Sequence, residues 1–181
     1  EEYAVHSFAA ASNTGDAVGL VQELGAKLDF KTVKVPMFSP THHPYTLSMV
    51  WLCNDPGMIM VNRDGRRFMN EAAPPGQTGA LEGQSGHIGY AIFDASGAER
   101  MGAALVERTA QADNAADMVH WKDDLEYECT LDQAGKKADT LEELAECIHM
   151  DPAVLRETVD TYNEGCARGE DAMGKPAQFL H

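Results

Sequence analysis

Apolar side chains recur with a helical period in some segments of the chain and have strand character in others. In residues 15–25 they have the spacing of one helix face, preceded by the turn-like run Asn13-Thr14-Gly15-Asp16 and followed by Gly25. Residues 30–44 are punctuated by prolines, which favour an extended backbone. The pattern therefore predicts a helix over residues 15–25 and extended chain after it.

Residues 57–72 read GMIMVNRDGRRFMNEA and carry the clearest strand signal of the chain. Residues 58–62 and 66–69 have the apolar or β-branched character of strands. Asp64-Gly65 lies between them and suits a two-residue loop that needs positive φ. The stretch therefore predicts a β-hairpin.

The middle of the chain predicts a loop, a strand and a helix in turn. Residues 74–89 contain a cluster of glycines and few large apolar side chains, which favours a loop. Residues 90–94, YAIFD, have the character of a buried strand. Ser96 with Glu99 fits a capping box for a helix, and a polar stretch over residues 109–124 follows that helix.

The last third of the chain has the clearest helical pattern. Thr140 with Glu143 fits a capping box, and Asp151-Pro152 supplies a cap and a first-turn proline for a second helix. Apolar residues share one face of each helix, namely Leu141, Leu144 and Ile148 on the first and Leu155, Val159 and Tyr162 on the second. All the elements together predict an α+β fold with a central β-hairpin or small sheet and flanking helices, which include this C-terminal helical hairpin.

Charge and composition exclude several classes of partner. Lysine and arginine number 14 against 29 aspartate and glutamate, and the formal net charge of −15 argues against a nucleic-acid surface. No apolar run is long enough to cross a bilayer, so we expect no membrane insertion. The chain contains no G-x-G-x-x-G run and no P-loop, and it does not begin with methionine. We therefore interpret it as an excised piece of a longer protein.

Candidate metal ligands, acids and thiols have mostly structural interpretations. The four cysteines lie far apart, which predicts reduced and mostly buried thiols. His42 and His43 have no matching carboxylate or histidine spacing nearby, so we predict no metal site. Two further groups are interpreted as solvated acids and as core filler: Glu82, Glu99, Glu107 and the run 123–126 in the first, and Met37, Met49, Met58, Met60 and Met69 in the second.

Five pieces of the sequence, taken in order, are similar to the fumarate reductase and succinate dehydrogenase flavoprotein family. They are SNTGDAVGLVQELGAKL, HHP, GMIMVNRDGRRFMNEA, GYAIFD and ADTLEELAECIHMDPAVLRETVDTYNEGCARGED. In that family a Rossmann-type FAD domain is interrupted by a substrate-capping domain. The resemblance implies that residues 1–28 end the FAD-binding domain and that residues 29–181 form the substrate-capping domain. It also implies FAD in the full-length parent, with none expected to bind to this fragment.

The resemblance also implies roles for particular residues. Thr14-Gly15-Asp16 resembles a Thr-Gly-Asp motif whose aspartate contacts the flavin, which implies Asp16 as the cofactor-binding residue. His43-Pro44 resembles a His-Pro that binds a substrate carboxylate, which implies His43 as a catalytic and substrate-binding residue.

Two departures from the family pattern concern the substrate. Trp51 and Leu52 take the places of a Thr-Glu pair of fumarate-acting members, which implies an apolar substrate wall. Pro75 stands where those members have the arginine that donates a proton, and proline carries no transferable proton.

The resemblance thus implies a parent enzyme that is an FAD-dependent oxidoreductase acting at an activated C–C bond next to a carbonyl or carboxylate, and not on fumarate itself. The fragment alone is expected to be inactive. Its expected partners are a small-molecule substrate and its own FAD-binding domain. The alternative is a non-catalytic flavoprotein cap, or a small-molecule binding module, that has lost its redox residues.

Overall fold

The computed structural model describes residues 16–25, 27, 46–73, 77–131 and 135–181. The chain divides into two compact units, Glu1–Lys34 and Val35–His181, and each is described by itself. The domain boundary implied by the resemblance, between residues 28 and 29, stays a prediction.

The described part of the first unit contains the helix α1, Asp16–Glu23, which agrees with the helix predicted over residues 15–25. Gly25 donates its backbone N–H to the Gln22 carbonyl at 2.9 Å and closes the turn after the helix. Leu20, Val21 and Leu24 carry the predicted apolar stripe, and all three are exposed.

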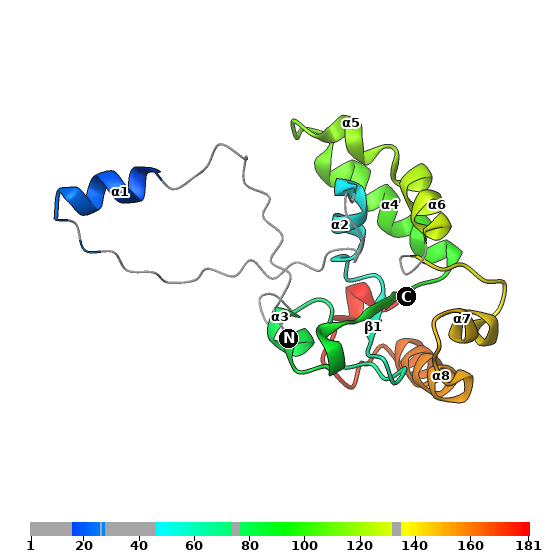
Figure 1. Ribbon diagram of the computed structural model, residues 1–181. Coiled ribbons are helices and arrows are strands. Elements are labelled where there is room, and N and C mark those ends of the chain that lie inside the picture. The colour runs from blue at the N-terminus through cyan, green and yellow to red at the C-terminus, as the bar shows by residue number, and fades with distance from the viewer. Residues whose placement is uncertain (1–15, 26, 28–45, 74–76, 132–134) are drawn as a thin grey trace. The chain divides into compact units, whose positions relative to one another are not determined.

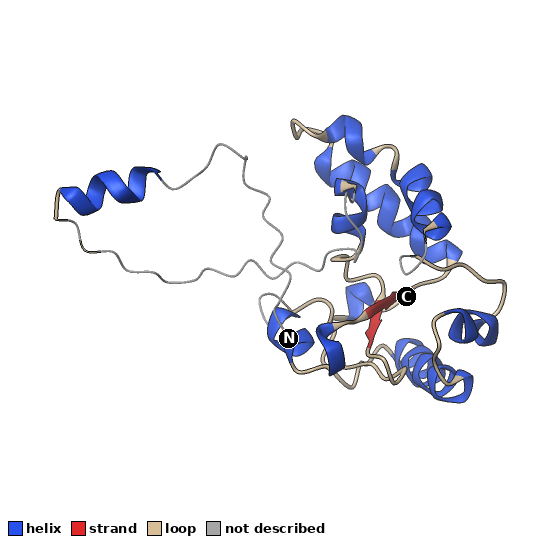
Figure 2. Cartoon of the chain, viewed as in Figure 1, coloured by secondary structure: helices blue, strands red, loops and turns tan. Residues whose placement is uncertain are grey.

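The second unit is a mixed helical fold around a two-stranded sheet, which confirms the α+β class in its coarse form (Figures 1 and 2). Its described elements are α2 (Leu47–Leu52), β1 (Ile59–Val61), α3 (Gln77–Glu82), β2 (Tyr90–Ile92), α4 (Ala95–Thr109), α5 (Ala115–Met118), α6 (Trp121–Thr130), α7 (Leu141–Cys147) and α8 (Pro152–Arg168), with 3-10 turns at Ser85–His87 and Ala177–Phe179.

The sheet pairs β1 with β2 in antiparallel register, with Met60 opposite Ala91. The predicted turn after β1 is present: Gly65 has φ of +76° and donates to the Asn62 carbonyl at 3.0 Å. The second arm of the predicted hairpin is shorter than expected, because residues 66–69 make only the single bridge Val61 to Arg67.

A side chain explains why that second arm does not continue as a strand. The Met60 N–H donates to the Glu71 carboxylate at 2.8 Å. In a longer ladder this N–H would donate to a backbone carbonyl of the second arm. Here it donates to a carboxylate, so the ladder ends.

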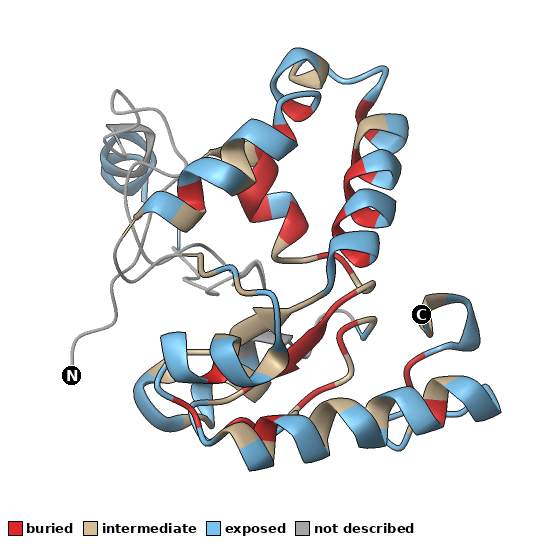
Figure 3. Ribbon diagram, turned by 90° about the vertical axis from the view of Figure 1, so that its right-hand side faces the viewer, coloured by how far each residue is buried: buried red, intermediate tan, exposed pale blue. Residues whose placement is uncertain are grey.

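Strand β1 is buried on both faces because it lies between two apolar clusters. Met58 and Met60 belong to a cluster shared with α2, α4, α5 and α6, whereas Ile59 and Val61 belong to a cluster shared with α7 and α8. Buried residues accordingly follow β1 and the inward sides of the helices in Figure 3, whereas β2 is half-buried. The methionines predicted as core filler are buried at Met49, Met58, Met60 and Met69, while Met37 lies outside the described residues.

Local capping predictions succeed in the last third of the chain and fail near the middle. Thr140 and Glu143 form the predicted capping box of α7, and Asp151 caps α8 with Pro152 in its first turn. The predicted cap of α4 is wrong: Asp94, and not Ser96, accepts the Gly97 N–H at 2.6 Å.

Two predictions along the middle of the chain need further correction. The loop predicted over residues 74–89 contains α3 and a 3-10 turn. The polar stretch over residues 109–124, for which the sequence predicted no element, contains α5 and the first residues of α6. Strand β2 is half-buried and not fully buried. Leu81 from α3 and Met118 from α5 both join the cluster around Met60, which supplies the tertiary support that their local sequence did not reveal.

Replacing Gly102 with alanine tests the packing of α4 against α6. A Cβ at Gly102 would lie 2.0 Å from Cε2 of Trp121. An alanine within a helix ordinarily gains about 0.5–1 kcal/mol over glycine. Here we expect Gly102→Ala to lower the free energy of unfolding by about 1–3 kcal/mol, because the indole must move. Urea unfolding measures the change.

Gly79→Ala is the matched control, since Gly79 lies in α3 and a Cβ added to it would meet no described atom within 4 Å. A Gly102→Ala variant as stable as the Gly79→Ala variant would contradict the close packing of Trp121 on α4.

Candidate functional site

The residues implicated by resemblance fall in different parts of the chain. His43 and Pro75 lie outside the described residues. Asp16 is the first residue of α1, and its side chain is not described. Trp51 and Leu52 both lie on α2, so the structure describes the surroundings of these two alone.

Trp51 and Leu52 point in different directions from α2. Successive residues of a helix are about 100° apart around its axis. Leu52 is buried in the cluster that contains Met58 and Met60, which we call the methionine-rich core, whereas Trp51 is 37% exposed. Trp51 is therefore the member of the pair whose side chain is accessible from solvent, and the role of either residue in substrate binding stays a prediction.

The structure also reveals a buried ionic cluster, which we define as Arg67, Glu71, Asp171 and Lys175. Their side chains are 8%, 1%, 4% and 0% exposed, respectively. Arg67 donates to Glu71 from Nε at 2.9 Å and from Nη2 at 2.6 Å, and it also hydrogen bonds to Asp171. The cluster therefore joins the segment after β1 to the segment after α8.

Lys175 completes the cluster and ties it to the residue before β1. Its Nζ lies 3.3 Å from a Glu71 carboxylate oxygen and donates to the Met58 carbonyl at 2.7 Å. It also donates to the Tyr162 hydroxyl at 3.1 Å. The Arg67 guanidinium and the Lys175 ammonium lie 4.9 and 5.0 Å from the centroid of the Tyr162 ring, respectively, so α8 contributes an aromatic face to both cations.

The two carboxylates and the two cations balance in number, which makes their burial tolerable. Burial alone would lower the pKa of Arg67, but its hydrogen bonds to Glu71 and Asp171 outweigh burial and raise that pKa. Burial would raise the pKa of Asp171, but Arg67 and the backbone N–H groups of Lys175 and Met173 lower it. Burial lowers the pKa of Lys175, against the opposing pull of Glu71.

The cluster fixes where the chain leaves the sheet. Glu71 is tied to Met60 and Arg67, and the Asn70 side chain donates to the Gly174 carbonyl at 2.8 Å. Ala72 donates in turn to the Asn70 side chain at 2.9 Å. The arrangement holds the segment Asn70–Ala72, which precedes Pro75 in the sequence by a few residues.

A groove of about 460 Å³ lies beside this cluster, between α8 and the segments around residues 66 and 171. Positive and negative side chains both line its walls: Arg66 lies 3.7 Å from Glu157, and Arg168 lies 4.0 Å from Glu164. Arg67 is committed to Glu71 and Asp171. The groove therefore offers no concentrated charge of one sign to a ligand.

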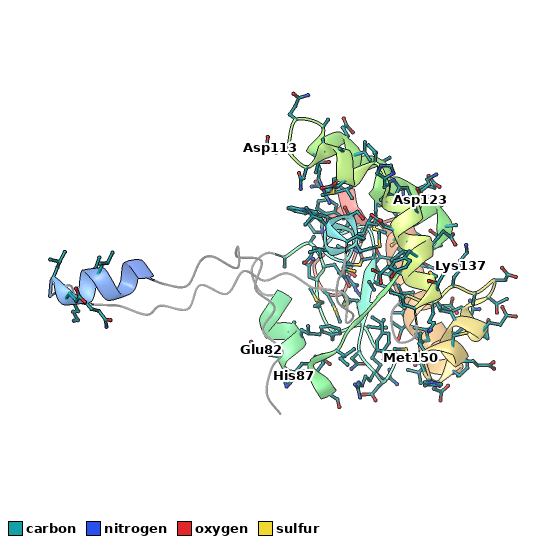
Figure 4. All side chains as sticks on the ribbon, turned by 45° about the horizontal axis from the view of Figure 1, so that its top comes forward. Glu82, His87, Asp113, Asp123, Lys137 and Met150 are labelled. Carbon is teal, nitrogen blue, oxygen red and sulfur yellow. The ribbon has the colours of Figure 1, made fainter. Side chains whose placement is uncertain are left out.

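The predicted solvated acids lie at the surface with one exception. Glu82, Glu99 and Glu107 are exposed. Figure 4 shows Asp113, Asp123 and Lys137 on the outer side of the helical part of the unit. Asp124 differs, because it is half-buried and accepts a hydrogen bond from the buried Ser48 hydroxyl of α2.

Thiol and metal chemistry find no support in the part of the chain that the structure describes. All four cysteines are free thiols, but the prediction that they are mostly buried is wrong, because three are half-buried and Cys147 is exposed. Burial, with Glu128 adding to it, raises the pKa of Cys53 to about 12, so this thiol stays protonated at neutral pH. No group of three potential ligands could hold a metal ion among the described residues. Nor does any described helix have the length and apolarity that a membrane span requires.

Comparison with known proteins shows the class of protein to which this chain belongs. A sequence model described as an FAD binding domain matches residues 2–179, so this is a flavoprotein sequence. The chain belongs to the FAD-binding family that includes the fumarate reductase and succinate dehydrogenase flavoproteins. The predicted family and its cofactor, FAD, are thereby confirmed.

Two curated relatives carry the names of reductases. The chain is 30% identical over 165 residues to "Probable fumarate reductase Ifc3" of Shewanella frigidimarina, which covers 90% of this chain and 24% of the relative. It is 29% identical over 163 residues to the urocanate reductase of Eggerthella lenta, which covers 87% of this chain and 24% of the relative. The chain thus spans about a quarter of the length of these relatives.

Two solved structures resemble the fold. The open conformation of a flavocytochrome c3 fumarate reductase matches with a TM-score of 0.59 and 30% identity, over 91% of this chain and 25% of that one. The solution structure of a fumarate reductase flavoprotein subunit from Lactobacillus plantarum matches with a TM-score of 0.51 and 20% identity, over 83% of this chain and 87% of that one. The second likeness concerns the fold alone.

Removing one carboxylate from the buried cluster tests its contribution to stability. We expect Glu71→Gln to lower the free energy of unfolding by about 3–5 kcal/mol, because it leaves the cations Arg67 and Lys175 buried without their shared partner. Glu142→Gln is the matched control, since Glu142 pairs with Arg156 at 2.7 Å on an exposed surface. We expect little change from that variant. Equal urea midpoints for the two variants would contradict the assignment.

The pH dependence of stability tests Asp171 separately. Its pKa is lowered in the folded protein, so its contribution is complete above the ordinary carboxyl pKa of about 4 and is lost as the pH falls through the folded value. We expect the stability difference between the unmodified chain and Asp171→Asn to be constant from about pH 5 to 7 and to shrink below about pH 4. Urea unfolding at each pH measures this difference, and Asp113→Asn removes an exposed carboxylate for comparison. A difference that grows toward acid would contradict the ion pair with Arg67.

Proposed function

We propose that this chain is the substrate-capping part of an FAD-dependent oxidoreductase that adds or removes hydride at an activated C–C bond next to a carbonyl or carboxylate, with a substrate other than fumarate. The observation that carries the proposal is the match of the FAD-binding family over residues 2–179, combined with Trp51 and Pro75 at two positions where fumarate-acting members carry polar or charged groups.

FAD, when bound, would accept or supply the hydride. The chain has no glycine-rich run that would hold the pyrophosphate, so only one of its residues is proposed to contact the cofactor. Asp16 begins α1, where the first backbone N–H groups of a helix have no partner within the helix. An acceptor residue beside such donors suits the polar edge of a flavin, which supports Asp16 as a cofactor-side residue.

His43 and Trp51 are proposed to divide substrate binding between them. A histidine can donate a charge-assisted hydrogen bond to a carboxylate or carbonyl oxygen near neutral pH. The exposed ring of Trp51 offers an apolar surface on the same chain. This combination favours a substrate less charged or more aromatic than fumarate, because a second carboxylate would lie against an apolar ring.

The buried ionic cluster is proposed to support the site without taking part in proton transfer. Its four charged groups bind one another, and Glu71 and Asn70 hold the chain that leads toward Pro75. Since Pro75 carries no transferable proton, the proton donor of the parent enzyme must be a side chain at another position. In this proposal the ionic cluster keeps the scaffold of the family, while proline replaces arginine at position 75.

The alternative is a flavoprotein cap, or a binding module, without catalysis, and Pro75 is the observation that favours it. Steady-state assays of the full-length holoprotein with chemically reduced flavin distinguish the two. Turnover of urocanate or another less charged unsaturated acid, with little turnover of fumarate, supports the oxidoreductase. Binding of such acids without turnover would support the binding module, and robust fumarate reduction would overturn the proposed substrate class.

His43→Ala in the full-length enzyme tests the proposed substrate contact. We expect kcat/KM to fall by an amount equivalent to about 2–3 kcal/mol of transition-state stabilisation, because a positioned charge-assisted hydrogen bond is lost. His120→Ala is the control, since His120 is exposed between α5 and α6. An unchanged kcat/KM for His43→Ala would remove His43 from the site.

A further inference from the structure

The Trp51 ring contacts Arg108, a residue that the family resemblance does not implicate. The guanidinium of Arg108, from the last turn of α4, lies 5.7 Å from the centroid of the Trp51 ring. Arg108 is partly exposed, with 40% of its side chain accessible. The two elements that carry this pair, α2 and α4, also share the methionine-rich core.

Arg108 is itself fixed by a buried carboxylate. Its Nη1 donates to Oδ2 of Asp55 at 3.1 Å, and the Asp55 side chain is only 8% exposed. The other carboxylate oxygen accepts the Gly57 N–H at 2.9 Å, and the Asp55 N–H donates to the Leu52 carbonyl at 3.0 Å. The turn between α2 and β1 therefore sets the position of Asp55, and Asp55 sets the position of the guanidinium.

The arrangement restricts a side chain that would otherwise have rotational freedom. An indole on the open side of a six-residue helix can adopt several rotamers, each presenting a different edge or face. A guanidinium within about 6 Å of the ring face favours the rotamer in which the ring lies under it. Arginine suits this task because its planar group can stack on the ring and still donate to a carboxylate, whereas the ammonium of lysine cannot lie flat on a ring.

We propose that Arg108 is a positioning residue for substrate recognition: anchored by Asp55, it holds the Trp51 indole as a flat wall that selects planar, conjugated carboxylates. This inference rests on the proposed function, in which Trp51 lines the substrate site. Arg108 acts through Trp51 and needs no contact with the substrate or the flavin.

The test uses the full-length holoprotein labelled with 5-fluorotryptophan and trans-cinnamate as the planar probe. The Trp51 fluorine resonance is assigned by its loss in Trp51→Phe. In Arg108→Met, which keeps an apolar side chain of similar length, we expect that resonance to shift or broaden and the affinity for trans-cinnamate, followed by flavin absorbance, to fall by about 3- to 10-fold. In Arg108→Lys we expect partial recovery, because lysine retains the charge without the planar stack.

Arg156→Met is the matched control, since Arg156 is similarly exposed and pairs with Glu142 on a surface away from Trp51. It should leave both the resonance and the affinity unchanged. Trp51→Ala tests the proposed wall independently of the role of Arg108. Unchanged cinnamate affinity in Trp51→Ala, or no binding by the unmodified protein, would overturn the proposed wall and the inference with it. Weakened binding in Trp51→Ala together with an unmoved resonance and unchanged affinity in Arg108→Met would overturn the role of Arg108 alone.

Discussion

Two carboxylates and two cations are buried together where the segment after β1 meets the segment after α8, and the arrangement of the second unit depends on their mutual compensation. An isolated charge at any of these positions would carry a desolvation cost of several kcal/mol. Glu71 meets Arg67, Lys175 and the Met60 backbone at once, so it joins the strand, the turn and the C-terminal segment. Asn70 and Glu71, at the end of the stretch 57–72, thus have a structural role that does not require fumarate chemistry.

Strand β1 transmits this constraint to both apolar clusters. Its alternate residues pack on opposite sides, with Met60 against α2 and α4 and Val61 against α7 and α8. Because α2 is anchored on the first cluster through Leu52, the adjacent Trp51 is presented at the surface. The ionic cluster, the strand and the proposed substrate wall are therefore parts of one packed unit.

Local chemistry predicted the elements whose signals are contained within a few residues. Thr140 with Glu143 and Asp151 with Pro152 satisfy their own helix ends, and Gly65 has the positive φ that its turn requires. At the start of α4, Asp94 and Ser96 are both residue types that cap helices, so the sequence alone could not decide which of them is the cap. The second arm of the hairpin, residues 66–69, was predicted too long because its pairing depends on Glu71, whose carboxylate accepts the Met60 N–H in place of a backbone carbonyl.

The ionic cluster and the orientation of the predicted wall needed the structure. Arg67 and Asp171 are 104 residues apart, and Lys175 is 117 residues from Met58, so no local pattern relates them. Trp51 and Leu52 are neighbours with similar apolar character, and only tertiary packing decides that Leu52 is buried. His43 and Asp16 stay predictions that rest on resemblance.

A double-mutant cycle between Glu71→Gln and Lys175→Met, followed by urea unfolding, tests the central claim most directly. If the four charges compensate one another in the folded state, removing the second partner after the first costs less than removing it alone. We predict a coupling free energy of about 1–3 kcal/mol, with the double variant more stable than the sum of the single losses implies. Single losses that add to within about 0.5 kcal/mol would show that Glu71 and Lys175 act independently and would contradict the account.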